Sequence, residues 1–171
     1  MSAIVVCPLS RLAETVAAYR ASHIVTLVNS DTLFSRPPVV PARNHLHVAI
    51  HDISEPMEGM VCPEAKHVQE YLAFMGRWDR AAPIIVHCYA GISRSTAAAF
   101  AALCAARPDL DEELIALRLR SRSPEATPNA RIVALADEIL GRSGRMRKAV
   151  EKIGRGAEAF EGTVFALPID E

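Results

Sequence analysis

A short apolar run that leads at once into a glycine-containing polar loop is the feature that most constrains this chain. The run, Pro83 to Val86, is typical of a buried strand because its Ile and Val residues are bounded by turn-forming residues. The loop reads His87-Cys88-Tyr89-Ala90-Gly91-Ile92-Ser93-Arg94-Ser95. Ser95 and Thr96 then precede the apolar stretch 97–103, which predicts the start of a helix. The chain is therefore expected to turn from a strand into a helix between Cys88 and Arg94.

A turn of this kind predicts an anion site. Its backbone N–H groups point inward, and the helix start adds about half a positive charge. Arg94 adds a planar guanidinium that suits two phosphate oxygens, and Gly91 suits a sharp turn or a positive φ. The same surroundings favour the thiolate form of Cys88, so thiolate and phosphate would share one site. Ser95 is placed to donate its hydroxyl to the sulfur.

The nine residues resemble the loop of the cysteine-based protein phosphatases, His-Cys-x5-Arg-Ser/Thr. The likeness is strongest to the dual-specificity branch, including bacterial-type protein tyrosine phosphatases, whose form is His-Cys-x-Ala-Gly-x-Ser-Arg-Ser. The resemblance implies a phosphocysteine formed on Cys88, with the phosphate oxygens bound by Arg94 and the loop residues. Those loop residues are Tyr89, Ala90, Gly91, Ile92 and Ser93. Cys7 is different: Ala13 stands where its arginine would have to be, so we expect Cys7 to be structural.

The likeness covers roughly residues 45–140 and is looser outside the loop. Arg122-Ser123-Pro124 and Pro128-Asn129 resemble the Arg-x-Pro and Pro-Asn positions of dual-specificity phosphatases. In that family the asparagine braces the phosphate loop, which makes Asn129 a candidate supporting residue. Its alternative is an ordinary residue of a first helical turn.

Transfer of phosphate to sulfur leaves an oxygen that needs a proton, so an acid is required on a nearby loop. In the resembling family this acid is an aspartate on a mobile loop that precedes the cysteine. Asp52 follows the strand-like stretch 45–50 and is itself followed by Pro56, which favours a loop. We expect Asp52 to be the acid because the strand end fixes its position. Glu55 and Glu58 are the competing candidates.

The histidines of this sequence invite a metal interpretation that we do not favour. Alternation would place His45, His47 and His51 on one face, but it is also typical of a half-exposed strand. The cysteines show no Cys-x-x-Cys pairing, so no metal and no cofactor are expected. His87 is expected to orient the loop through hydrogen bonds and to help keep Cys88 ionised.

Alternating strands and helices followed by a helical cluster predict an α/β fold. We expect a single-domain three-layer sandwich with a central, mostly parallel sheet of about four to five strands flanked by helices, as in the phosphatases. Residues 1–143 would form the phosphatase domain, and 144–171 a C-terminal helix and tail packed on it or extending it. The expected strands are 3–6, 24–28, 45–50 and 84–86, and the expected helices are 9–19, one from Pro63, one from Ser95, 111–120, 128–140 and 146–153.

Composition and charge limit the classes of partner that this chain is expected to bind. A net charge of −1 over 171 residues disfavours a nucleic-acid or membrane-surface protein. The N-terminus lacks a signal-peptide pattern, and the four cysteines form no disulfide framework, which together predict a cytoplasmic location. The uncharged residues inside the loop disfavour polyphosphorylated substrates. We expect phosphotyrosine in a protein first, phosphoserine or phosphothreonine next, with a small phosphomonoester left open and the oligomeric state undetermined.

Two other classes remain open at this point. A phosphate-binding module without turnover would use the same loop, but such a protein usually lacks the cysteine, the arginine or the acid. A sulfur-transfer or arsenate-reducing enzyme would use the Cys88 thiolate, with Cys62 or Cys104 as its thiol partner.

Overall fold

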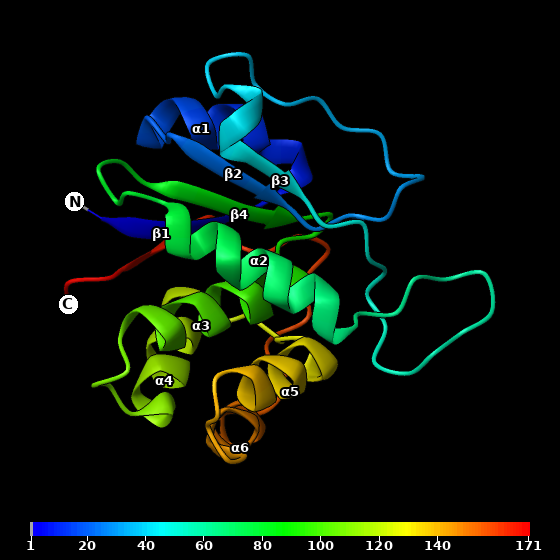
Figure 1. The fold of residues 1–171 in the computed structure, drawn as a ribbon, viewed down its shortest axis with the longest axis vertical. Helices are drawn as coiled ribbons and strands as arrows, with labels where there is room; N and C mark the ends of the chain where they lie inside the picture. Colours follow the sequence, from blue (N-terminus) through cyan, green and yellow to red (C-terminus); the bar gives the residue numbers. More distant parts are fainter. Residues whose placement is uncertain (1) are drawn as a thin grey trace.

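The computed structural model describes residues 2–171 and places five strands in one mixed sheet of order β3-β2-β4-β1-β5 (Figure 1). The strands are β1 (Ala3–Pro8), β2 (His23–Thr26), β3 (His45–His47), β4 (Ile84–Cys88) and β5 (Phe165–Pro168). The first four are parallel, whereas β5 runs antiparallel to β1 at one edge. The expected mostly parallel central sheet is confirmed.

Helices cover both faces of this sheet, which confirms the three-layer sandwich. One face carries a 3-10 turn (Leu9–Arg11) and α1 (Leu12–Tyr19), and Ala42–Asn44 forms a second 3-10 turn. The other face carries α2 (Ala65–Arg77), α3 (Arg94–Ala106), α4 (Glu112–Arg122), α5 (Ala130–Ile139) and α6 (Arg145–Ile153) (Figure 1). The larger core lies on this second face, and a smaller core lies beneath α1. Within residues 2–171 no helix is long and apolar enough to cross a membrane.

Helix α3 is the central support of the larger face. Its residues from Arg94 to Cys104 are all buried, and five of these eleven are alanines. Small side chains let the helix lie close to the sheet and to α4 and α5, and Phe100 is the one aromatic ring in this buried run. The N-terminus of α3 is therefore fixed by packing along the whole helix.

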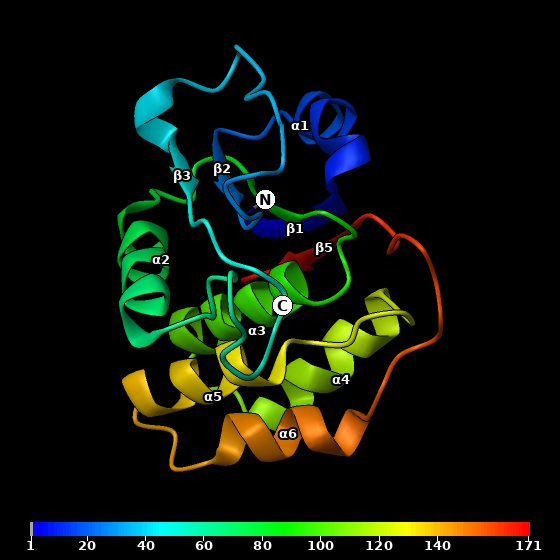
Figure 2. The same cartoon turned by 90° about the vertical axis from the view of Figure 1, so that its right-hand side faces the viewer.

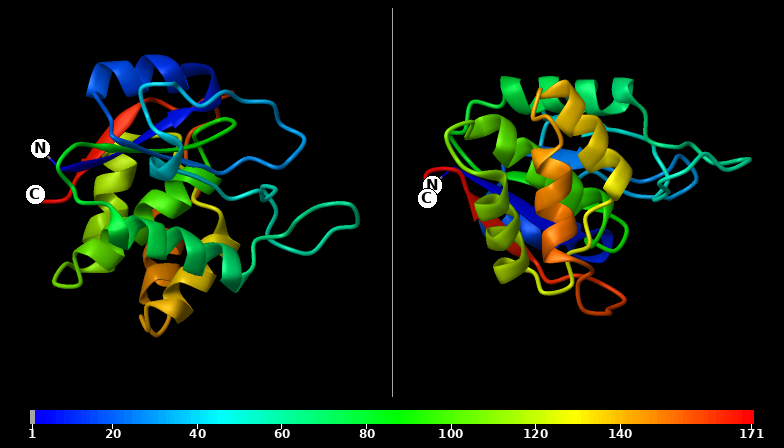
Figure 3. Two further views of the ribbon diagram at one scale, coloured as in Figure 1. Left: turned by 45° about the horizontal axis from the view of Figure 1, so that its top comes forward. Right: turned by 90° about the horizontal axis from the view of Figure 1, so that it is seen from below.

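The structure differs from the sequence-based expectation most clearly at two places, and β2 also spans His23–Thr26 rather than 24–28. The strand expected over 45–50 ends at His47, after which Val48 still bonds to the Thr26 carbonyl but the chain turns away from the sheet. The tail was expected to hold only a helix and an extension, and β5 was missed. This strand is four residues long and ends at Pro168, so its pairing with β1 is not visible in a local pattern. The two termini lie side by side as a result (Figure 3).

The parallel strands place their C-terminal ends at one edge of the sheet, where several segments converge. The long loops after β2 and β3 project from this edge (Figure 1), and the β4–α3 loop begins at the same edge. Residues 154–164, which we call the strap, run from α6 back to β5 along the same side of the molecule (Figure 2).

Candidate active site

The loop between β4 and α3 holds Cys88 at its base. Cys88 is only 2 % exposed, and its Sγ lies 3.3 Å from the Gly91 nitrogen, which donates to it, and 3.1 Å from the Ser95 Oγ. Gly91 has a φ of +71°, and a Cβ there would lie 2.8 Å from the Pro8 nitrogen. Only glycine fits this turn, which brings an amide and a hydroxyl onto the sulfur.

The carbonyl groups of the loop are held away from Cys88 by donors from elsewhere in the fold. A peptide plane points its N–H opposite to its C=O, so a carbonyl bound on the outside turns the next N–H toward the inside. Four loop carbonyls are bound in this way: Tyr89 by the Leu9 N–H (3.0 Å), Ala90 by the Gly162 N–H (2.8 Å), Ile92 by the Thr127 N–H (3.0 Å) and Ser93 by the Asn129 N–H (3.2 Å). The concave face above Cys88 is therefore lined by donors suited to an oxyanion.

Arg94 completes this donor set. Its side chain is 8 % exposed, and its Nη1 donates to the Ile50 carbonyl at 2.8 Å, which fixes the plane of the guanidinium. Its Nε is buried and has no hydrogen-bond partner among the described residues. An unpaired buried N–H costs free energy, which a phosphate oxygen would recover by accepting from it.

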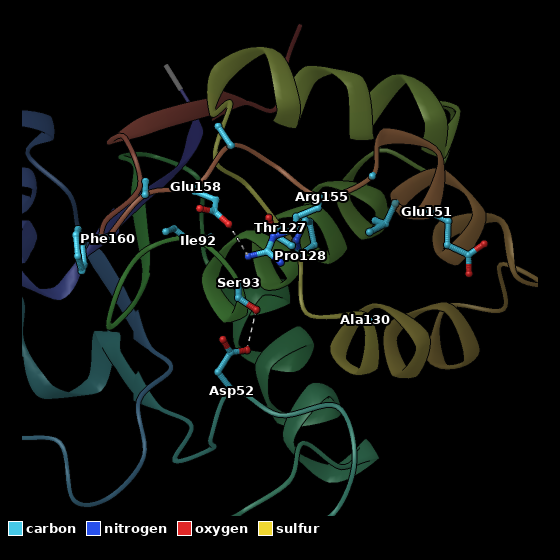
Figure 4. Close-up of a pocket in the computed structure, with 14 residues that line it drawn as sticks. Asp52, Ile92, Ser93, Thr127, Pro128, Ala130, Glu151, Arg155, Glu158 and Phe160 are labelled. Carbon is cyan, nitrogen blue, oxygen red and sulfur yellow. Dashed lines mark hydrogen bonds and ion pairs between the residues drawn. The ribbon is translucent and has the colours of Figure 1, made fainter.

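Asp52 lies at the rim of the loop rather than at its base. One carboxylate oxygen accepts from the Ser93 hydroxyl at 2.7 Å and from the Asn129 side-chain amide at 2.9 Å; Figure 4 shows the first of these contacts. Glu55 and Glu58 are exposed farther along the same segment and make no hydrogen bond to the loop in the described structure. Of the three candidate acids, Asp52 is the one that the fold ties to the phosphate loop.

Asn129 has more contacts than the sequence indicated. Its Oδ1 accepts from the Ile132 N–H and caps α5, its backbone N–H holds the Ser93 carbonyl, and its amide holds Asp52. One residue therefore links the acid, the loop and a helix. The link to Asp52 spans 77 positions in the chain, so no local pattern reveals it.

The strap is a second feature that sequence reasoning missed. Gly162 donates to the Ala90 carbonyl, and a Cβ on Gly162 would lie 2.6 Å from the Gly91 oxygen. The only signal in the sequence is the presence of three glycines, Gly154, Gly156 and Gly162, in this short tail. The tail thus helps to shape the loop around Cys88.

His87 is completely buried directly before Cys88. Its Nε2 and the Thr26 Oγ1 lie 2.8 Å apart, and its Nδ1 lies 3.3 Å from the Cys88 carbonyl. Burial lowers the pKa of His87 from 6.5 to about 4, so the imidazole is neutral at pH 7. His87 supports the loop through hydrogen bonds, and it contributes no charge that would help to ionise Cys88.

His45, His47 and His51 each have a different hydrogen-bond partner. His45 bonds to Thr26, His47 donates to the Val28 carbonyl, and the His51 Nδ1 accepts from the Val61 N–H. Because β3 ends at His47, the expected alternation does not reach His51. Residues 2–171 contain no group of three His, Cys, Asp or Glu side chains that could hold a metal ion.

The buried state of His87 predicts a pH effect on stability. Between pH 6.5 and about 4, His87 is protonated in the unfolded chain but not in the native state. The free energy of unfolding therefore falls as the pH is lowered through this range. We expect this group to lower the free energy of unfolding by about 2 kcal/mol between pH 7 and pH 5. Urea denaturation of wild type and His87→Asn at both pH values measures it. The variant should lose less stability on acidification, and an equal loss in both proteins would contradict the assignment.

The fold and the loop define the class of structure. No protein-family model and no curated sequence matches this chain. Solved phosphatase structures match it in fold: DUSP15 (TM-score 0.62, 19% identity, covering 89% of this chain and 92% of that one) and human DUSP28 (0.61, 17%, 87% and 94%). The human tyrosine phosphatase-like serine/threonine/tyrosine-interacting protein also matches (0.61, 19%, 82% and 92%). The chain therefore has the fold of the dual-specificity and tyrosine phosphatases.

Proposed function

We propose that this protein hydrolyses phosphate monoesters through a phosphocysteine on Cys88. The observation that carries the proposal is the buried Cys88 sulfur beneath inward-facing amides, with Arg94 alongside and Asp52 at the rim. Each group has the chemistry that phosphoryl transfer to sulfur requires: a nucleophile, donors for the oxygens of the transition state, and an acid for the leaving oxygen.

The reaction has two steps. The Cys88 thiolate attacks phosphorus and the ester P–O bond breaks, while protonated Asp52 gives its proton to the leaving oxygen. Water then attacks the phosphocysteine, Asp52 accepts a proton from it, and the S–P bond breaks. The Ser95 hydroxyl, 3.1 Å from the sulfur, stabilises the departing thiolate. No metal or cofactor takes part in this scheme.

The proposed substrate is a phosphorylated protein, with phosphotyrosine preferred over phosphoserine and phosphothreonine. The loop residues around the phosphate are uncharged apart from Arg94, so they provide no further cation for a second phosphate. Tyr89 belongs to the loop and is 62 % exposed, so its ring is free to contact an aromatic leaving group. We also propose a cytoplasmic location, because the reaction needs a reduced thiol and all four cysteines are free.

One fold neighbour is named as phosphatase-like and interacting, so a binding module is the second candidate. The presence of thiol, arginine and acid together at this loop favours hydrolysis.

Thiol exchange has weaker support. Cys104 lies ten residues beyond Arg94 along α3, about 15 Å from the loop, and burial raises its pKa to about 12.

Hydrolysis of p-nitrophenyl phosphate by the wild-type protein tests the proposal. We expect turnover that persists in EDTA and is inhibited competitively by orthovanadate, because vanadate mimics the five-coordinate transition state that the loop would bind. A protein that binds phosphate but releases no nitrophenol would support the binding module instead. Activity abolished by EDTA would contradict the metal-free mechanism.

A further inference from the structure

A groove opens beside the candidate active site and is walled by the strap. Its volume is about 860 Å³, which lies within the range of sites that hold a ligand or a short peptide segment. Asp52, Ile92 and Ser93 line the end nearest the loop. Figure 4 shows Phe160, Glu158 and Arg155 of the strap around the same space. The groove is therefore continuous with the place where a substrate phosphate would sit.

The strap is held firmly although it has no regular secondary structure. Arg120 donates to the Ile153 and Gly154 carbonyls at its start, and the Gly156 N–H donates to the Thr127 hydroxyl. At its other end the Gly162 N–H holds the Ala90 carbonyl of the phosphate loop. Tethering at both ends fixes the wall of the groove before anything binds.

Phe160 is the conspicuous residue of this wall. Its side chain is fully exposed, yet it stands within a tethered segment and lines the groove together with Ile92, Pro128 and Val150. An exposed aromatic ring among apolar side chains is typical of a surface that buries a partner. This side of the groove suits an apolar side chain.

The charges of the groove disfavour a ligand that carries a second phosphate group. Its ionisable residues are Asp52, Glu151, Glu158 and Arg155, so carboxylates exceed cations. Arg155 is already paired with Glu158 at 3.6 Å. The remaining negative charge favours a basic residue and repels an additional phosphate group.

We propose that this groove binds the polypeptide flanking a phosphorylated residue, and that it prefers a flank with an apolar and a basic side chain. The inference rests on the proposed function and specifies its substrate class: a singly phosphorylated protein segment rather than a polyphosphorylated metabolite. When a phosphorylated residue of the substrate sits above Cys88, the substrate polypeptide on one side of it would pass Asp52 and Ser93. The groove begins at these two residues. Phe160 acts as a specificity-determining residue at its rim.

The test measures binding in the Cys88→Ser background, where turnover cannot consume the probe. The probe is a fluorescent nine-residue peptide with a central phosphotyrosine and one leucine and one arginine on each side, and its affinity is read by fluorescence anisotropy. Adding Phe160→Ala should weaken binding about tenfold, and adding Glu151→Lys about threefold. Leu117→Ala, an exposed leucine on α4 outside the groove, is the matched control and should change nothing.

A second peptide carries serine for leucine and glutamate for arginine. Its affinity for the Cys88→Ser protein should be about tenfold lower than that of the first peptide. Adding Phe160→Ala should change this affinity little. Equal affinity for both peptides, or equal affinity in the Phe160→Ala and Leu117→Ala proteins, overturns the groove proposal. So does a dimer that dissociates on Phe160→Ala, because a second copy would then be the occupant.

The peptide-binding test and the hydrolysis test can fail independently of each other. Selective peptide binding by a protein that does not hydrolyse p-nitrophenyl phosphate would support the groove and overturn the hydrolase. Hydrolysis without selective peptide binding would leave the hydrolase in place and overturn the groove.

Discussion

Cys88→Ser is expected to lower kcat for p-nitrophenyl phosphate by at least about 10⁴-fold, while inorganic phosphate still binds. A serine hydroxyl in this position is a far weaker nucleophile at pH 7 than a thiolate. The substitution leaves the amides of the loop, the Arg94 guanidinium and the bound carbonyls unchanged. Chemistry should be lost while the oxyanion site remains, and steady-state kinetics with isothermal titration of inorganic phosphate separates the two.

Cys62→Ser is the matched control for this prediction. Cys62 is half-buried beyond the Asp52 segment and makes no contact with the phosphate loop in the described structure, so its serine variant should keep wild-type kcat. A fall in both variants would point to thiol exchange between Cys88 and Cys62. Full activity in Cys88→Ser would rule out the covalent intermediate.

The strand, loop and helix over residues 83–103 could be predicted because every signal for them is local. An apolar run ends, a nine-residue motif follows, and small apolar residues begin a helix, all within about twenty positions. Asp52 is predicted from a strand expected to end at residue 50; β3 in fact ends at His47, five positions before Asp52, yet Asp52 still lies beside the loop. Its place near the loop follows from the parallel sheet, which gathers such ends at one edge.

The features that sequence reasoning missed depend on contacts between distant parts of the chain. Strand β5 forms only because β1 offers an edge, and Phe165 to Pro168 give too short a pattern to predict it. The Gly162 contact with Ala90 joins the tail to the loop. The neutral state of His87 depends on its complete burial in the central strand β4, whereas the sequence shows only that His87 precedes Cys88.

Contacts between distant parts of the chain also shape the surface that we propose for the substrate. The phosphate loop needs donors on the outside of its carbonyls, and here one of them, Gly162, comes from the C-terminal strap. The same strap presents Phe160 at the groove that Asp52 also lines. A single segment therefore contributes both to the geometry around the phosphate and to the groove that would receive the rest of the substrate.

Asp52→Asn is expected to reduce kcat in proportion to how much the leaving oxygen needs a proton. For phenyl phosphate and phosphotyrosine, whose leaving groups are poor, we expect a loss of about 10² to 10³-fold. For p-nitrophenyl phosphate, whose leaving group departs readily as the anion, the loss should be less than about tenfold. Asparagine keeps an oxygen that can accept from Ser93 and Asn129, so the loop should hold its place. A series of substituted phenyl phosphates gives the slope of kcat against leaving-group basicity, which should steepen in the variant.

Glu55→Gln and Glu58→Gln serve as matched controls, since both carboxylates lie on the same segment as Asp52. Neither should alter the slope, because neither side chain bonds to the phosphate loop. A steeper slope in one of them, with Asp52→Asn resembling wild type, would move the acid to that glutamate and would require the segment to rearrange when substrate binds. An unchanged slope in all three would mean that the leaving oxygen takes its proton from water. The hydrogen bonds that join Asp52 to Ser93 and Asn129 would then serve only to hold the loop in shape.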